Sequence, residues 1–254
     1  MQIIEATWEK RNLNCEAYEI NIEKEDLNDI KGLISNIEKN EKIKNSYTVI
    51  KTPVANLELI HHLQKIGFEF METQFEITRK VTDPLPKYME KLSASFEIEY
   101  IPKDKERWDE IISLITENLF TTDRVYLDYT LPSATSSIRY KNWLKDLYDN
   151  PNAWMAIIKK NEEPWMFNCC INKPENKRIN YLLAGVFEKY KNSGMGTILP
   201  IPTIKYGVEN NFDIIESSIS SNNIAILRLY EYYNFTTQNA KYVLRLNTTK
   251  RRYL

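Results

Sequence analysis

Two glycines separated by a single residue, Gly194 and Gly196, follow closely on a run of mostly apolar residues at 179–187. The whole chain has only six glycines among 254 residues, so composition alone does not account for the pair. The apolar run predicts a buried strand, and residues 197–210 predict a helix. Glycine permits a sharp turn close to a ligand, and a helix start presents unpaired amides and the positive end of its dipole. The stretch therefore predicts an anion-binding turn, with a purely structural strand–turn–helix connection as the alternative.

A second strand is predicted at 212–220, and the motif that follows it allows a more specific prediction of function. Residues 191–196, K-N-S-G-M-G, resemble the coenzyme loop Arg/Gln-x-x-Gly-x-Gly/Ala of the GNAT superfamily of N-acetyltransferases. The later signature of that family is an Asn, then a Tyr seven residues on, then Gly-Phe four and five residues beyond. It is matched here by Asn223, Tyr230, Asn234 and Phe235.

The resemblance implies an α/β (α+β) chain with the GNAT fold, in which helices flank a mixed central sheet. This acetyltransferase domain is expected to cover residues 95–254. Residues 1–81 alternate strand and helix signals and predict a smaller α/β N-terminal domain. Residues 82–94 begin T-D-P-L-P, and because two prolines disfavour both helix and central strand, a linker is expected there.

Apolar periodicity places individual elements along the chain. Helices are predicted at 26–39, 56–66, 103–119 and 136–148. Strands are predicted at 14–22, 46–51, 68–80, 96–101, 153–159, 165–171 and 241–246. Gly67 is a good C-terminal cap for the helix at 56–66, and Gly32 lies unfavourably inside the helix at 26–39.

The N-terminal domain repeats the spacing of the later signature. The positions with this spacing are Asn56, Leu63, Gly67 and Phe68, and leucine stands where the tyrosine would be. No Gly-x-Gly loop precedes them. Two explanations stay open: a chance similarity between two amphipathic helices, or a degenerate half-GNAT unit that cannot hold coenzyme. Neither explanation assigns any chemistry to this domain.

Composition excludes several other functions. The formal net charge is −1 and the basic residues are spread along the chain, so no nucleic-acid footprint is present. No apolar run of about 18 residues predicts a membrane span, and the first residues do not resemble a signal peptide, so a cytoplasmic protein is expected. Cys15, Cys169 and Cys170 form neither a disulfide framework nor a metal-ligand spacing. His61 and His62 lack partner spacing as well, so structural or surface roles and no metal are expected.

The resemblance implies acetyl-coenzyme A as the cosubstrate. Closely spaced amides at 192–197 suit the charge of a pyrophosphate, and the backbone at 183–186 is expected to pair with the pantetheine arm as an added strand. Lys191 stands where the family has arginine or glutamine, and Gly185 is expected to mark a bulge. The residues assigned to the coenzyme are Leu183, Ala184, Gly185, Val186, Lys191, Asn192, Ser193, Gly194, Met195, Gly196, Thr197, Asn223 and Tyr230.

Tyr230 is the candidate general acid. A phenol with a pKa of about 10 is protonated at neutral pH and can donate to the developing thiolate of coenzyme A. The alternative is a tyrosine that packs with Tyr232 and Tyr233 on an aromatic helix face. The general base is not evident from the sequence, and Glu188, Glu216 and a bound water are the candidates.

Two further stretches narrow the resemblance. Residues 122–126 (T-D-R-V-Y) and 140–143 (Y-K-N-W) are similar to segments of bacterial N-acetyltransferases that act on nucleotide-linked 4-amino-4,6-dideoxy sugars, of the dTDP-fucosamine acetyltransferase type. That family has a Ser-Arg loop and a Tyr-x-x-Trp helix at these places. Here Asp123-Arg124 replaces Ser-Arg, so the match is partial.

This narrower resemblance implies a small-molecule amine, the sugar of a sugar nucleotide, as the acceptor and a homodimer as the assembly. Arg124 is expected to hold the diphosphate through a bidentate contact, and Tyr126 or Tyr129 to stack on the base. Two other functions stay open. One is the same chemistry on another amine, such as a small molecule, an antibiotic, a polyamine or a protein N-terminus, although the near-neutral net charge argues a little against strongly cationic substrates. The other is an acyl-coenzyme A sensor without turnover.

The sequence departs from the family pattern after the glycine loop. Pro200 and Pro202 fall early in the predicted helix, and proline beyond a first turn removes a backbone hydrogen bond, so this helix is expected to start late or to kink. Asn234 replaces the usual glycine, which is a mild change because asparagine tolerates a left-handed turn. Asn223 is expected to be either a coenzyme contact or a helix N-cap.

Overall fold

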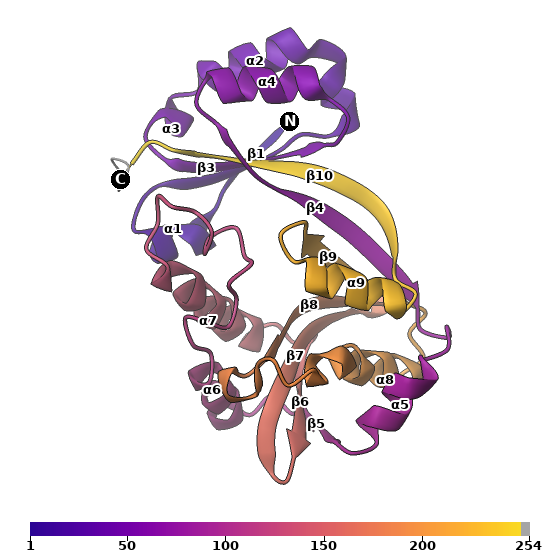
Figure 1. Cartoon of the computed structure of the whole chain (residues 1–254). Helices are drawn as coiled ribbons and strands as arrows, with labels where there is room; N and C mark the ends of the chain where they lie inside the picture. Colours follow the sequence, from indigo (N-terminus) through magenta and orange to yellow (C-terminus); the bar gives the residue numbers. More distant parts are fainter. Residues whose placement is uncertain (250–254) are drawn as a thin grey trace.

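The computed structural model describes residues 1–249 and folds them around one mixed sheet (Figure 1). The strands are β1 (Gln2–Glu5), β2 (Ala17–Asn21), β3 (Tyr47–Pro53), β4 (Glu69–Lys80), β5 (Glu97–Ile101), β6 (Ala153–Lys160), β7 (Glu163–Lys173), β8 (Arg178–Val186), β9 (Ile214–Ser220) and β10 (Thr236–Asn247). They lie in the order β1-β2-β3-β10-β4-β9-β8-β7-β6-β5.

Helices cover both faces of this sheet (Figure 1). The α-helices are α1 (Thr7–Leu13), α2 (Ile30–Glu38), α3 (Glu41–Lys44), α4 (Leu57–Lys65), α5 (Lys87–Ser93), α6 (Lys105–Ser113), α7 (Ala134–Tyr148), α8 (Ile201–Glu209) and α9 (Ile224–Tyr232). Short 3-10 turns are η1 (Lys24–Asp29), η2 (Pro174–Asn176), η3 (Glu188–Tyr190) and η4 (Met195–Ile198). Among residues 1–249, none of the helices is both long enough and apolar enough to cross a bilayer.

Two units of the chain share one plan, a strand, a helix and a long strand. The units are β3–α4–β4 and β9–α9–β10, and every element of the second begins and ends 167 residues after its counterpart in the first. The side chains of Asn56 and Asn223 each accept a hydrogen bond from an amide in the first turn of the following helix. After the helices, Gly67 and Asn234 take positive φ angles of 99° and 61°. These shared bounds, caps and turns favour a repeated half-domain over a chance similarity of two helices.

The two units exchange their long strands. β10 lies antiparallel between β3 and β4, and β4 pairs in turn with β9. The register is repeated too, since Lys241 lies opposite Pro53 and Gln74 lies opposite Ser220. Each long strand therefore pairs with the first strand of the other unit. As a result the sheet runs without a break from the N-terminal half into the C-terminal half (Figure 1).

Residues 82–94, where the sequence suggests a linker, contain helix α5. It begins after Pro86, a position where proline is tolerated because the first amides of a helix have no partner within it. Leu85, Met89 and Leu92 pack against the core of the C-terminal half. The buried guanidinium of Arg79 donates to the carbonyl of Tyr233 at 3.1 Å and so ties the end of β4 to the end of α9.

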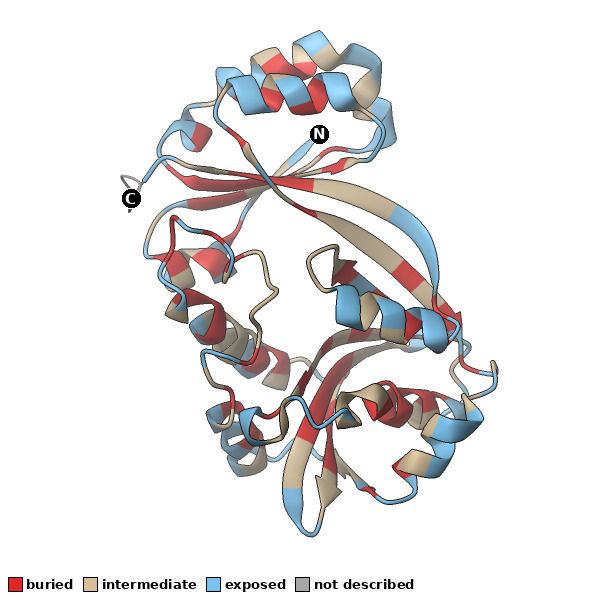
Figure 2. Ribbon diagram, viewed as in Figure 1, coloured by how far each residue is buried: buried red, intermediate tan, exposed pale blue. Residues whose placement is uncertain are grey.

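Two apolar clusters pack against the C-terminal strands. The first core cluster lies among β7, β8, β9, α8 and α9 and includes Cys170, Ile179, Tyr181, Ile204, Ile215, Tyr230, Tyr233 and Phe235. The second core cluster lies among α6, α7 and β6–β8 and includes Trp108, Ile111, Leu144, Met155, Phe167, Cys169 and Leu183. In the N-terminal half, α2 and α4 bury one side each over the sheet and leave the other side exposed (Figure 2).

The sheet opens between β8 and β9. These parallel strands are paired only from Arg178 opposite Ile214 to Asn180 opposite Glu216, and beyond this point they diverge. β8 carries a bulge at Leu182, because Tyr181 and Leu183 lie opposite consecutive residues of β7. The expected bulge at Gly185 is wrong: Gly185 pairs regularly with Phe167. A Cβ at Gly185 would come within 3.0 Å of that phenyl ring, so packing explains this glycine.

Candidate active site

A cavity of about 590 Å³ lies at the divergence of β8 and β9. Both core clusters reach it, since Tyr181 and Tyr230 of the first and Leu183 of the second are among its lining residues. Other lining residues of the C-terminal half are Phe120, Thr122, Asp123, Arg124, Arg139, Tyr140, Trp143, Asp146, Asn180, Leu182, Ala184, Ser217, Ser218, Ile219, Ser220, Asn223 and Ile226. The cavity therefore passes through the gap in the sheet and is accessible to groups from both faces.

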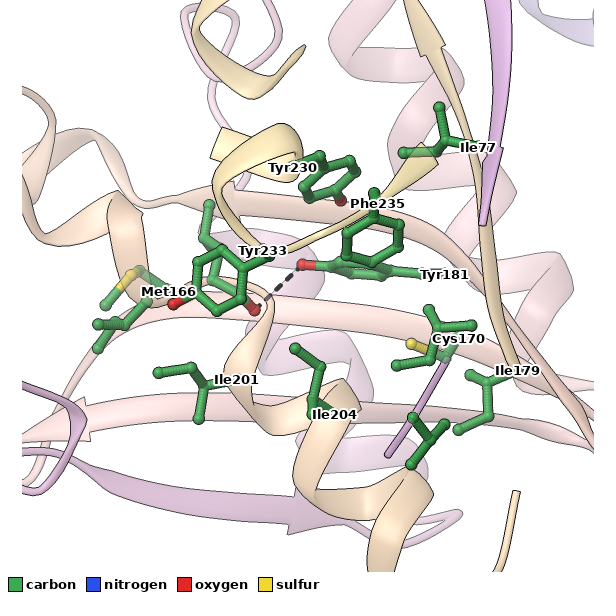
Figure 3. Close-up of a cluster of buried hydrophobic side chains, with 14 of the residues drawn as sticks. Ile77, Met166, Cys170, Ile179, Tyr181, Ile201, Ile204, Tyr230, Tyr233 and Phe235 are labelled. Carbon is green, nitrogen blue, oxygen red and sulfur yellow. Dashed lines mark hydrogen bonds between the residues drawn. The ribbon is translucent and has the colours of Figure 1, made fainter. Parts of the chain in front are cut away.

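Tyr230 lies at this gap with 6% of its surface exposed. Its ring stacks on Phe235, with centroids 4.6 Å apart, and lies 5.9 Å from the ring of Tyr181 (Figure 3). Burial raises the pKa of Tyr230 above its ordinary value, and hydrogen bonding with Tyr181 and Ser217 only partly opposes this shift. The phenol consequently holds its proton throughout the neutral range, as a proton donor must.

The neighbouring tyrosines of α9 have different surroundings, so the expected alternative of one shared aromatic face does not describe Tyr230. Tyr232 is about half exposed. Tyr233 is fully buried and its hydroxyl donates to the carbonyl of Thr197 at 2.9 Å. Tyr233 thereby ties α9 to the end of the glycine loop, and Tyr230 alone of the three reaches the cavity.

Asn223 has the capping role that the sequence allows, and its contact with coenzyme stays a prediction. Its Oδ1 accepts a hydrogen bond from the amide of Ile226 at 3.3 Å, which makes it the N-cap of α9. It also lines the cavity. A polar side chain at the start of this helix is therefore available to a ligand without leaving its capping position.

The glycine loop offers free amides beside the first core cluster. Asn192 and Gly194 take positive φ angles of 63° and 75°, and the turn η4 follows. The amides of Asn192, Gly194 and Gly196 donate no hydrogen bond to any residue of the 1–249 range. A Cβ at Gly196 would come within 3.1 Å of Val186, so this position needs the glycine for close packing. Three unpaired and accessible amides in one turn suit a pyrophosphate.

The helix after the loop starts late, as the prolines predict. Residues Met195–Ile198 form a 3-10 turn, and the α-helix begins only at Ile201, after Pro200 and with Pro202 in its first turn. Because a first-turn amide has no partner within the helix, neither proline removes a helical hydrogen bond. Ser193 and Thr197 complete the loop: the hydroxyl of Ser193 accepts from the amide of Met195, and that of Thr197 donates to the carbonyl of Gly194.

The edge of β8 that faces the gap is open. Residues 183–186 pair with β7 on one side, but the pairing with β9 ends at Asn180. Leu183 and Ala184 line the cavity, whereas Gly185 and Val186 do not. An extended ligand backbone can add to such an edge in the way a strand does.

Lys191 and the two glutamates lie away from the cavity. The ammonium of Lys191 donates to the carbonyl of Asn118, whose side chain donates to Glu188 at 2.9 Å. Hydrogen bonds from Thr116 and Asn118 lower the pKa of Glu188. This network holds the segment after α6 against the loop.

Glu216 faces an ion cluster, with Lys173 at 2.5 Å and Arg178 at 3.1 Å. Burial by itself would raise the pKa of Glu216, but the hydrogen bonds from these two cations hold it below the usual value. Neither Glu188 nor Glu216 lines the cavity, so neither is placed as the general base there.

Arg124 lines the cavity and has one weak partner. Its Nη2 lies 3.7 Å from Oε1 of Glu9, the same oxygen that accepts a 2.6 Å hydrogen bond from Arg139. The Nε of Arg124 is buried and has no hydrogen-bond partner within the described residues. Tyr126 is not part of the lining. Tyr129 is not part of it either, and its hydroxyl donates to Glu69 at 2.7 Å.

The N-terminal half supplies one wall of the cavity, which the sequence did not predict. Its lining residues are Trp8, Arg11, Asn12, Glu19, Lys51, Glu72 and Gln74. They come from α1, β2, β3 and β4, and no local motif links them. The strand exchange brings the residues of β3 and β4 to the gap, and α1 is held there by its contacts with α7, such as the hydrogen bond of Arg11 to Asp146. Only these long-range contacts could have indicated their role.

These features together define the fold class. A mixed sheet that opens between two parallel strands, a glycine loop after the first and a capped helix after the second form the GNAT fold, and solved structures of GNAT proteins match the chain.

Three solved structures illustrate the likeness. A GCN5-related N-acetyltransferase from Sphaerobacter thermophilus is matched with a TM-score of 0.58 at 9% identity, over 97% of this chain and 76% of that one. A tandem GNAT protein from the clavulanic acid biosynthesis pathway is matched with a TM-score of 0.54 at 8% identity, over 86% and 69%. A conserved protein of unknown function from Staphylococcus epidermidis gives a TM-score of 0.60 at 14% identity, over 91% and 83%. A scan against family models and a search of curated proteins found no match to the sequence.

Proposed function

We propose that this chain is an N-acetyltransferase that uses acetyl-coenzyme A to acetylate a primary amine of a small molecule. The observation that carries the proposal is the position of the buried, protonated Tyr230 at the gap between β8 and β9. A sensor would need the coenzyme site alone. A proton donor at the point where the coenzyme edge of β8 meets the rest of the cavity has its use in acyl transfer.

The residues present fit the coenzyme. The free amides of Asn192, Gly194 and Gly196 would bind its pyrophosphate, and the open edge of β8 at 183–186 would hold its pantetheine arm. Acetyl-coenzyme A supplies an acetyl group activated as a thioester. Tyr230 holds the proton that the departing sulfur requires, and Asn223 orients the start of α9 beside it. The amine must lose a proton before it attacks, and a water in the cavity is the proposed acceptor of that proton.

Arg124 favours one class of acceptor, an amine that also carries an anionic group. Its unpaired Nε and its shared partner Glu9 favour an anion as an additional ligand, as the diphosphate of a nucleotide-linked 4-amino-4,6-dideoxy sugar would be. Such a ligand would compete with Glu9 for the guanidinium. The amino-sugar nucleotide is therefore a second candidate acceptor within the same chemistry.

The test is release of free thiol from acetyl-coenzyme A with a panel of simple amines, diamines and amino-sugar nucleotides. For the variant Tyr230→Phe we expect kcat to fall at least about tenfold, with KM for acetyl-coenzyme A little changed. Tyr232→Phe is the matched control, since Tyr232 is on the same helix but outside the cavity. Coenzyme binding without turnover of any amine would replace the enzyme with a sensor.

The pH dependence provides a second readout for Tyr230. Its raised pKa means that the folded protein retains the phenolic proton where a free tyrosine would start to lose it, near pH 10. Wild-type kcat should consequently show no loss attributable to this group below about pH 10. A basic limb in the neutral range that disappears in Tyr230→Phe would mean that Tyr230 itself loses its proton there, which would contradict its raised pKa.

A further inference from the structure

Glu72 on β4 is a buried carboxylate that lines the cavity. Only 5% of its surface is exposed, yet it makes no hydrogen bond or ion pair with any residue in the 1–249 range. Its carboxylate oxygens are not among the fully buried unpartnered atoms of the described residues, so they open onto the cavity, where a charged ligand group can reach them. The charge of Glu72 makes no contact that stabilises the fold, so a neutral residue of the same size would pack equally well.

The other carboxylates of the cavity wall already have partners. Glu19 is 2.9 Å from the ammonium of Lys51. Asp146 is hydrogen bonded to Arg11, and Asp123 accepts from the amide of Val125 and the hydroxyl of Ser136. Each of these negative charges is thereby compensated or hydrogen bonded. Among the lining carboxylates of the described chain, Glu72 alone is left for a ligand.

The register places Glu72 away from Tyr230. Ser217, a neighbour of Tyr230 in the cavity lining, lies opposite Ile77, five residues along β4 from Glu72. At about 3.3 Å per residue, these two levels are about 16 Å apart along the strand. Glu72 is therefore not positioned for the chemical step at the thioester.

The wall around Glu72 suits a cation. Gln74, two residues along the same strand, faces the same cavity, and so do the indoles of Trp8 and Trp143. Amide oxygens and aromatic faces both attract positive charge, and a carboxylate forms its strongest contacts with cationic donors. The basic side chains of the lining pair with other carboxylates, Arg11 with Asp146, Lys51 with Glu19 and Arg139 with Glu9, so within the described residues none of these three neutralises Glu72.

We propose that Glu72 is a specificity-determining residue that binds a second, positively charged group of the acceptor, which makes a diamine the preferred substrate class. This inference rests on the proposed acetyltransferase activity. One amine of the acceptor lies at Tyr230 and is acetylated, and the other nitrogen stays protonated and binds Glu72. The N-terminal half thus supplies acceptor recognition, while the C-terminal half supplies the coenzyme site and the acid.

Octamethylenediamine and octylamine form a matched pair of probes, since they have the same chain length and differ in the distal amine. We expect wild type to prefer the diamine. In Glu72→Gln the kcat/KM for the diamine divided by the kcat/KM for the monoamine should fall about 10- to 100-fold. This is the size of effect expected for the loss of one charge-assisted hydrogen bond. Glu76→Gln makes the same change on the same strand outside the cavity and should leave the ratio as in wild type. An unchanged ratio in Glu72→Gln, or turnover confined to sugar nucleotides, would overturn the inference.

Two measurements keep this test separate from the proposed function. Calorimetry of octamethylenediamine binding to the protein without coenzyme should show affinity in wild type and a loss of at least about tenfold in Glu72→Gln. That result without turnover of any amine would refute the enzyme and retain the cation site. Turnover of amines together with diamine binding that does not depend on Glu72 would retain the proposed enzyme and refute the cation site. The Tm of Glu72→Gln should be no lower than that of wild type, because an unpaired buried charge has been removed, and a clear drop would indicate a structural role.

Discussion

The units β3–α4–β4 and β9–α9–β10 have the same length, register, helix caps and left-handed turns, yet only the second has its helix at the cavity. At equivalent positions Leu63 is fully buried among apolar side chains, and Tyr230 faces the cavity. The strands that precede the units also differ. β2 pairs with β3 along all five of its residues, whereas β8 leaves β9 after Asn180.

This difference shows what converts a packing unit into a site. The helix and the long strand are the same in both halves, so neither is sufficient. A diverging partner strand is needed to open the sheet, together with a polar side chain at the helix position that faces the opening. The N-terminal unit lacks both, but its long strand contributes to the other unit's cavity through the exchange.

The largest effect should follow from separating the two halves. A fragment of residues 95–254 would leave β10 without β3 and β4, its neighbours on both sides, and would expose apolar side chains such as Val243 and Leu244. We expect this fragment to lack cooperative thermal unfolding in circular dichroism. Mixing it with residues 1–94 should restore the transition if the strand exchange carries the stability. A fragment that unfolds cooperatively alone would support the independent domains that the sequence suggests.

A smaller effect is expected from changing the two equivalent helix positions. Leu63→Ala should lower the free energy of unfolding by about 2–5 kcal/mol, since it leaves a cavity among fully buried side chains. Its kcat, measured well below its Tm, should remain near wild type. Tyr230→Phe should show the opposite order, with a loss of about 1 kcal/mol in urea unfolding and a large loss of kcat. Equal losses of kcat in the two variants would contradict the assignment of a purely structural role to Leu63 and a catalytic role to Tyr230.

The smallest effects should come from the two capping asparagines. Asn56→Ala and Asn223→Ala each remove a side-chain bond to a first-turn amide, so both should cost about 1 kcal/mol of stability. Only Asn223 lines the cavity, so only Asn223→Ala should also raise the KM for acetyl-coenzyme A. If Asn56→Ala changed KM to the same extent, the kinetic effect would have to be attributed to general destabilisation.

Local sequence signals predicted most of the elements and some of the site. The prediction of a helix at 56–66 closed by Gly67 is confirmed by α4, and that of a strand at 68–80 by β4. The helix predicted at 103–119 is too long, since α6 ends at Ser113, although the apolar positions beyond it remain buried. α1 and α5 were not predicted, because α1 has only two buried positions in seven residues and α5 begins directly after a proline.

The sequence by itself determined the turn at the glycine loop and the placing of Tyr230 seven residues after the cap at Asn223, because these depend on residue types at short, fixed spacings. The GNAT fold followed from the resemblance that these residues carry. Tertiary structure alone decided the exchange of β4 and β10, the bulge at Leu182 and the wall of the cavity that contains Glu72. These features arise from pairings between residues far apart in the chain. Such pairings depend on the packing of whole faces, which no local pattern encodes.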